Sequence, residues 1–258
     1  LMSLVLPSMR RPARAYVRTF VEAGEATVFI AIMCAIAGIV VGCLGLTGLG
    51  SSLSQNLIAA SGGSIWLLLI FSAIGCIILG MGVPVTATYI ILVILIGPAF
   101  EQLGINKMGA HMFIFYFGTL SFLTPPVCLS VFVASSIARS APMKTALEAL
   151  KLAVVAYIIP FAFVLNPAFL LQGTLVEIGA AIIGGVASVF LISAGLVGYL
   201  ARRVSVVMRL VLIAIGVASF FLTGLHPAFA LLPLAAIVLL YGQQKLMGGS
   251  AAGAVVGS

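Results

Sequence analysis

The chain has 258 residues, of which 63% are hydrophobic and only 7% are charged. A single soluble core cannot bury so large an apolar fraction, so the composition excludes a soluble domain and indicates an integral membrane protein. The net charge of +7 would suggest nucleic-acid binding in a soluble protein, but here the basic residues stand in short loops beside apolar runs. We therefore expect a lipid bilayer, and no nucleic acid, as the partner.

Residues 12–25 predict an amphipathic helix. Arg14, Arg18 and Glu22 recur at every fourth position, so their charges share one helical face and leave an apolar side. We expect residues 1–25 to form a cytoplasmic or interfacial helix along the membrane surface. A solvated charged face that leads directly into the first span is the alternative.

Long apolar runs follow. Several reach the roughly 20 residues that a helix needs to cross about 30 Å of hydrocarbon, and they lack the alternation of barrel strands. The predicted fold class is therefore an all-α polytopic membrane protein. The predicted elements are a span at 26–46, a Gly/Ser-rich stretch at 45–64, two apolar arms at 65–79 and 89–100, a broken run at 111–138, and spans at 146–165, 178–200, 206–222 and 227–241.

Lysine and arginine gather on one side of this layout, which the positive-inside rule assigns to the cytoplasm. The N-terminus of the chain is then cytoplasmic, and Lys107 alone lies on the outer side. The rule does not distinguish a re-entrant hairpin at 65–100 from two full crossings. The residues on the inner side are Arg10, Arg11, Arg14, Arg18, Arg139, Lys144, Lys151, Arg202, Arg203, Arg209 and Lys245.

Two polar interruptions, GMGVPVTAT at 80–88 and LTPPV at 123–127, divide these apolar runs. Unwound backbone in hydrocarbon leaves N–H and C=O groups unsatisfied, so it is tolerated only inside protein or beside a polar cavity. In secondary transporters such breaks form sites near the bilayer midplane, where carbonyls bind cations and half-helix N-termini face anionic groups. The alternative is a pair of proline kinks buried in helix packing.

The first interruption carries residue types suited to such a site. Gly80 and Gly82 allow close backbone approach, and Pro84 opens the returning arm. Thr86 and Thr88 add hydroxyl groups.

In the second interruption we expect Thr124 to cap the new half-helix and Pro125 to occupy its first turn, where a missing N–H costs nothing.

The acidic residues bear on the coupling ion. The sequence contains no aspartate, and its five glutamates map to loops or span ends: Glu22, Glu25, Glu101, Glu148 and Glu177. A carboxylate proton relay inside the membrane is therefore not available in this chain. Neutral carbonyl and hydroxyl oxygens suit a hard monovalent cation, so we predict coupling to Na⁺.

Three runs carry a family resemblance: GMGVPVTATYIILVILIGPAFEQLGI, HMFIFYFGTLSFLTPPVCLSVFVASSIA and MKTALEALKLAVVAYIIPFAFVLNPAFLLQG. Over residues 26–173 the chain resembles the C-terminal half of the large membrane subunit of tripartite ATP-independent periplasmic (TRAP) transporters. The GMG-x-P form, the AGIVVGCLGLTGLG stretch and the NPA-x-LLQG ending are most similar to the TAXI-type fused permeases.

The resemblance implies an elevator-type importer of small organic acid anions (carboxylates) that is driven by a Na⁺ gradient. The positions that match the family's cation site are Gly80, Gly82, Ser121, Thr124 and Val127. The resemblance implies no other metal, no organic cofactor and no enzymatic activity. The family often has glycine at the Ser121 position, and the acidic residue that other branches carry after GM is replaced by Gly82-Val83-Pro84. The candidate substrate-binding residues are Pro84, Thr86, Thr88, Pro125 and Pro126.

The family is built from two inverted repeats, each with one hairpin and one broken helix, and this chain has one of each. We therefore expect the first repeat and a small fused membrane subunit upstream, in a multi-pass protein of a bacterial or archaeal inner membrane that is fed by an extracytoplasmic substrate-binding protein. The expected second repeat covers 26–173, with a hairpin at 65–100, a broken helix at 111–138 and a span at 146–165. Additional transmembrane helices would occupy 174–245, and a flexible tail 246–258.

Two other functions remain open from the sequence. The EAL at 148–150 with IIP at 158–160 weakly resembles the coupling motif of an ABC-importer permease subunit, but its internal glycine is missing. A purely structural membrane partner is the other alternative. An intramembrane hydrolase is not supported, because no suitable Asp pair, Ser–His pair or HExxH is present.

Overall fold

The computed structural model describes residues 13–199 and 204–239, which are helical with no β-strand. This confirms the all-α prediction. By length and composition, α5, α8 and α9 are each able to cross a membrane, and a bent helix pair raises the number to four. The helices are α2 (Ala13–Thr47), α3 (Leu49–Ser61), α4 (Ile65–Gly80), α5 (Val85–Gln102), α6 (Lys107–Leu120), α7 (Leu129–Ala138), α8 (Pro142–Leu165), η2 (Pro167–Leu170), α9 (Leu175–Val197), α10 (Val206–Leu222) and a last helix, Pro227–Leu239, that opens with η3 (Pro227–Ala230).

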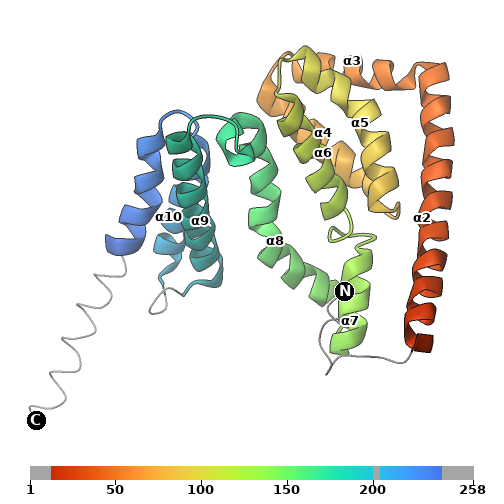
Figure 1. Ribbon diagram of the computed structural model, residues 1–258. Coiled ribbons are helices and arrows are strands. Elements are labelled where there is room, and N and C mark those ends of the chain that lie inside the picture. The colour runs from red at the N-terminus through yellow and green to blue at the C-terminus, as the bar shows by residue number, and fades with distance from the viewer. Residues whose placement is uncertain (1–12, 200–203, 240–258) are drawn as a thin grey trace, which may run out of the picture.

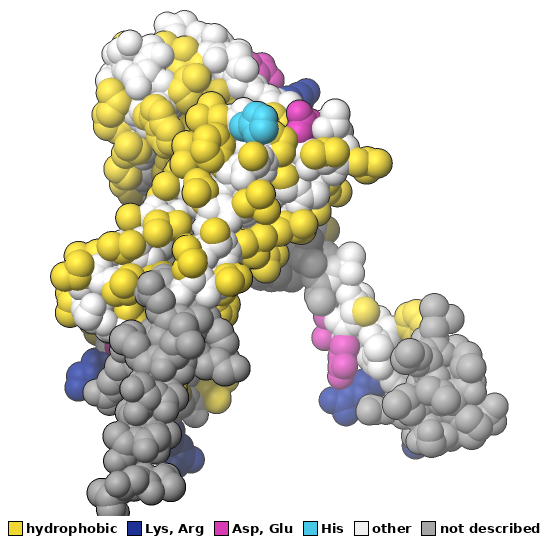
Figure 2. Space-filling view, turned by 90° about the vertical axis from the view of Figure 1, so that its left-hand side faces the viewer, with side chains coloured by type: hydrophobic (Ala, Val, Ile, Leu, Met, Phe, Trp, Pro, Cys, Tyr) yellow, Lys and Arg dark blue, Asp and Glu magenta, His cyan; other side chains and the backbone are white. Residues whose placement is uncertain are grey.

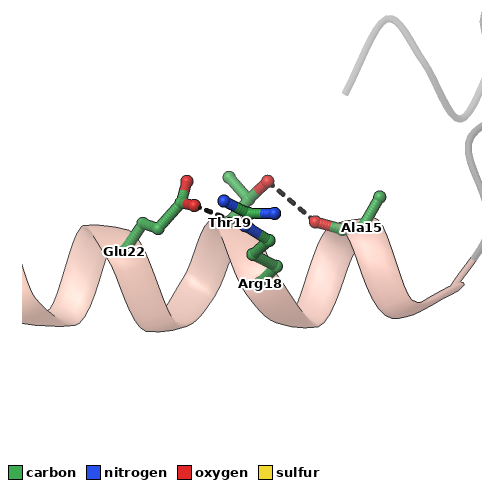
Figure 3. A network of polar contacts seen from close by, with 4 residues as sticks. All are labelled: Ala15, Arg18, Thr19 and Glu22. Atoms are coloured by element: carbon green, nitrogen blue, oxygen red, sulfur yellow. Dashed lines mark hydrogen bonds and ion pairs between the residues drawn. The ribbon is translucent and has the colours of Figure 1, made fainter.

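The helix α2 is continuous where the sequence predicts a separate surface helix at 12–25. It runs from Ala13 to Thr47 without a break, because the segment contains no proline, and Gly24 weakens a helix by only about 1 kcal/mol without ending it. The Arg18 guanidinium pairs with the Glu22 carboxylate at 2.7 Å one turn away (Figure 3). The predicted charged face is therefore the first part of a longer helix.

The Gly/Ser-rich stretch, for which the sequence predicts no element, forms α3. It lies at 70° to the last part of α2, and the bend falls at Gly48, whose φ of 65° favours glycine. α3 packs across α5: the Ser54 hydroxyl donates to the Leu95 carbonyl at 2.8 Å. Small residues allow this close approach, as they do generally between membrane helices.

Helices α4 and α5 form a hairpin against α6 (Figure 1). α4 descends from the end of the molecule where α3 lies, and α5 returns to that end. Their shared core is built from large buried side chains, among them Leu68, Leu92, Phe100 and Phe113. Phe100 and Phe113 meet edge to face at 5.4 Å, a favourable aromatic geometry. These contacts hold the hairpin against α6.

The helices after α8 form a second group, in which α9 packs along α10. The two short 3₁₀ helices, η2 and η3, pack against two adjacent glycines of α9. A Cβ at Gly184 would lie 3.1 Å from the Cα of Ala230 in η3, and one at Gly185 would lie 2.7 Å from the Phe169 ring in η2. A side chain at Gly185 would force the Phe169 ring to move, and one at Gly184 would require η3 to shift by a few tenths of an ångström.

The surface of the molecule is apolar where lipid is expected. Figure 2 shows hydrophobic side chains over the middle of one face, with charged side chains toward its ends. Ile137, Leu152 and Val186 are each more than two-thirds exposed, which is unfavourable in water but ordinary in hydrocarbon. This pattern supports a multi-pass membrane protein.

Candidate functional site

The hairpin tip and the break between α6 and α7 lie at about half the height of α2 (Figure 1). Both predicted interruptions therefore fall at one level, between the two ends of the molecule. Each is flanked by helices, so unwound backbone is placed where only protein or a polar cavity can satisfy it.

At the hairpin tip, α4 ends at Gly80 and α5 begins at Val85, with Pro84 directly before it. Gly82 has a φ of 78°, a conformation that glycine adopts without strain. Thr88 is 2% exposed, and its hydroxyl donates to the Val83 carbonyl at 2.9 Å. The structure places Pro84 at the start of the returning arm, as predicted, but Gly82 serves the backbone turn and makes no close approach. Thr88 also serves the turn itself.

The break extends from Ser121 to Cys128. The predicted role of Thr124 as a helix cap is wrong: its hydroxyl donates back to the Leu120 carbonyl at 2.7 Å, and α7 begins only at Leu129, after Cys128. Pro125 lies before this helix and not in its first turn, because the ring of Pro126 disfavours helical backbone at the residue that precedes it.

The two interruptions touch through small residues. A Cβ at Gly80 would lie 2.7 Å from the Ser121 Oγ and 3.1 Å from the Gly118 carbonyl oxygen, and one at Gly118 would lie 3.2 Å from the Thr88 methyl group. The structure therefore brings together Gly80, Thr88 and Ser121 from the predicted set.

Other predicted residues do not join this junction. Gly82, Thr86 and Pro126 are exposed, and a Cβ at Gly82 would meet no atom within 4 Å.

Several backbone carbonyl oxygens at the interruptions are open, in the sense that they accept no backbone hydrogen bond. Among the carbonyls from Leu123 to Val127, all of them described, only that of Thr124 accepts a backbone hydrogen bond. At the hairpin tip the Gly82 carbonyl accepts none in the described structure, whereas the Gly80 carbonyl accepts the Val83 N–H at 3.5 Å. Open carbonyls of this kind are ligands for hard monovalent cations.

None of the five acidic side chains is buried. All five glutamates are exposed; Glu22 and Glu148 pair with neighbouring basic residues on their own helices. No cluster of three or more His, Cys, Asp or Glu side chains able to hold a metal occurs in the ranges 13–199 and 204–239. Any cation at the interruptions would therefore be held by neutral oxygens.

Two residues at the junction escaped the sequence analysis. Gly118 lies three residues before Ser121 and accepts its hydroxyl at 2.6 Å, so its proximity to Ser121 in a helix was a usable signal. Tyr157 comes from α8, and its hydroxyl lies 2.7 Å from the Thr124 hydroxyl. It sits inside an apolar run 33 residues away, so no local pattern reveals it.

Comparison with known proteins gives one match. The family model of the DctM component of the tripartite ATP-independent periplasmic transporters matches residues 1–178. No curated protein and no solved structure shows significant similarity to the chain.

Proposed function

The chain belongs to the family of the DctM component of tripartite ATP-independent periplasmic transporters, and from this premise we propose that it imports small organic acid anions together with Na⁺. Membership identifies a permease of a secondary transporter and argues against both an enzyme and an ABC-importer permease subunit. The substrate class and the coupling ion are our proposal.

The observation that carries the proposal is the contact between the two interruptions. Gly80 meets Ser121, and the hairpin tip and the break between α6 and α7 lie at mid-height of the molecule. The open carbonyls of Gly82 and Val127 belong to the same two interruptions. We propose that these oxygens, with the Thr124 hydroxyl, bind Na⁺. Neutral oxygens and the exposed position of every glutamate favour Na⁺ over a proton as the coupling ion.

For the anion we propose the side of the interruptions where new helices begin. α5 starts at Val85 and α7 at Leu129, and helix N-termini carry partial positive charge that attracts carboxylates. Thr86 is exposed beside the first of these termini, so it is our first choice for a substrate contact. Pro84, Pro125 and Pro126 would shape the site, and buried Thr88 would support it from behind.

The proposed assembly includes more than this chain. We propose that it is the second half of a TAXI-type fused permease, whose first repeat and small membrane subunit precede it, and that an extracytoplasmic substrate-binding protein delivers the anion. The inner membrane of a bacterium or archaeon is the proposed location, with the N-terminal end of α2 on the cytoplasmic side. Transport would proceed by an elevator-type movement of the hairpin and the broken helix.

The test is uptake of radiolabelled carboxylates into proteoliposomes that contain the full-length permease and its binding protein, with and without an inward Na⁺ gradient. We expect uptake to need Na⁺ and to fall at least tenfold in Thr124→Ala.

The control is Thr119→Ala, because Thr119 makes the same bond to the carbonyl four residues earlier at 2.8 Å, but is exposed on α6. Uptake that ignores the Na⁺ gradient would refute Na⁺ coupling, and absence of any carboxylate uptake would favour a structural membrane partner. An equal loss in Thr119→Ala would remove Thr124 from the site.

A further inference from the structure

Tyr157 of α8 is the one side chain outside the two interruptions whose hydroxyl reaches Thr124, among the contacts of the described residues. The Thr124 hydroxyl has a single hydrogen and two lone pairs. Its 2.7 Å contact with the Leu120 carbonyl uses that hydrogen, because a carbonyl only accepts. The 2.7 Å contact with Tyr157 must then have the tyrosine as donor.

This assignment determines which hydrogen-bonding capacity of the Thr124 hydroxyl stays unused. One lone pair receives the Tyr157 proton, the hydrogen points at Leu120, and one lone pair stays open. A hydroxyl held in this way presents an acceptor in a fixed direction. An unrestrained hydroxyl would have to give up rotational freedom on binding a cation.

The Tyr157 ring is itself held in place. It lies 6.3 Å from the Phe117 ring, which in turn packs edge to face with Phe161 at 5.6 Å. Phe117 belongs to α6 and Phe161 to α8, so these rings connect the two helices. Phe117 is 2% exposed within the main core. The phenol oxygen is thus the polar end of a side chain fixed by packing, and α8 is the element that anchors the break.

We propose that Tyr157 is a positioning residue for the Na⁺ site: it donates to Thr124 and so directs the open lone pair of that hydroxyl toward the cation. This inference rests on the proposed Na⁺ site at the interruptions. Tyr157 acts through Thr124 and does not itself bind the ion. It couples the Na⁺ affinity of the break to the position of α8.

The test is the Na⁺ dependence of carboxylate uptake by full-length Tyr157→Phe permease in proteoliposomes with its binding protein. A neutral hydrogen bond accounts for roughly a 3- to 10-fold change in an equilibrium constant. We therefore expect the half-saturating Na⁺ concentration to rise by about that factor. The maximal rate and the anion KM at saturating Na⁺ should stay close to wild type, which a general structural defect would not produce.

The matched control is Tyr116→Phe. Tyr116 is also half-buried and packs on Phe163 at 5.4 Å, but its hydroxyl has no hydrogen-bond partner among the described residues. It should keep the wild-type Na⁺ dependence. An equal shift in both variants would overturn the proposal, and so would unchanged half-saturation in Tyr157→Phe.

A second readout does not depend on transport. Na⁺ that binds the folded permease raises its unfolding temperature by mass action, and this rise, compared with K⁺, should need more Na⁺ in Tyr157→Phe. In a Thr124→Ala background the same tyrosine change should have no further effect; an undiminished effect there would overturn the proposal. If wild-type uptake is Na⁺-independent, the proposed function itself fails, an outcome distinct from a Na⁺-dependent permease that is indifferent to Tyr157.

Discussion

The close contact between Gly80 and Ser121 predicts that adding one methyl group, in Gly80→Ala, pushes the two interruptions apart. In Gly80→Ala the new Cβ would lie 2.7 Å from the Ser121 Oγ, 3.0 Å from its Cβ and 3.1 Å from the Gly118 carbonyl oxygen. Ordinary van der Waals contacts of a Cβ begin at 3.4 Å. Rotation of the serine relieves only the first contact, so the hairpin tip must move away from the broken helix.

The cost follows from these contacts. Rotation of Ser121 breaks its 2.6 Å hydrogen bond to Gly118, worth about 1 kcal/mol, and overpacking of the remaining contacts costs about 1–3 kcal/mol. Alanine recovers up to about 1 kcal/mol of helix propensity. The net destabilisation is then about 1–3 kcal/mol, which lowers the Tm of the permease.

The assay is thermal unfolding of the purified full-length permease in one detergent, with two further variants beside Gly80→Ala. Gly75→Ala is the control on the same helix, because a Cβ there meets only the Ile96 Cδ1 at 3.9 Å; it should be neutral or stabilising. Ser121→Gly removes two of the three close contacts, so it should restore part of the stability in the double variant, with a coupling of about 1–2 kcal/mol.

Two results would refute this reasoning. One is a Gly80→Ala protein as stable as Gly75→Ala. The other is strict additivity between Gly80→Ala and Ser121→Gly, since residues in contact should couple. Either would mean that the hairpin tip and the broken helix do not touch at these residues.

Three further predictions concern stability and are read from the same unfolding experiment. Leu171 adopts a φ of 60° and is 67% exposed, so Leu171→Gly should raise stability by about 1 kcal/mol through relief of backbone strain; a lower Tm would contradict this. The Arg209 guanidinium donates to the carbonyls of Gly195 and Leu196 at 2.8 and 2.6 Å, so Arg209→Met should cost about 1.5–3 kcal/mol, and an unchanged Tm would show that these contacts contribute nothing. The Asn106 side chain accepts two backbone N–H groups at the start of α6, so Asn106→Ala should cost about 1 kcal/mol while Asn106→Asp costs less; equal losses in the two would argue against capping.

The general class of the protein could be predicted because the properties behind it are local. An apolar fraction of 63% excludes water around most of the chain, and the length of each apolar run sets the length of each helix. Clustered glycine and proline mark the two interruptions, whereas the single prolines Pro98 and Pro160 lie inside continuous helices. The helices 142–165 and 206–222 accordingly begin and end close to their predicted limits.

The local roles at the break could not be predicted in the same way. Thr124 has the residue type and position of a helix cap, yet its hydroxyl turns back to Leu120 and meets Tyr157. A threonine hydroxyl bonds forward as a cap or backward within a helix at similar energy. The choice depends on which partner the neighbouring helix supplies, and that helix lies 33 residues later in the chain.

The sequence by itself determined that this chain is helical, lies in a membrane and is interrupted at 80–88 and 123–127, because hydropathy, helix length and the special backbones of glycine and proline act over a few residues. Tertiary structure alone decided that the Gly/Ser-rich stretch forms α3 across the hairpin and that Gly80 rests on Ser121. Tyr157 likewise reaches Thr124 only in the folded chain. These contacts join helices distant in sequence, and in a bilayer their energy comes from close packing and hydrogen bonds between particular surfaces, which no single helix specifies alone.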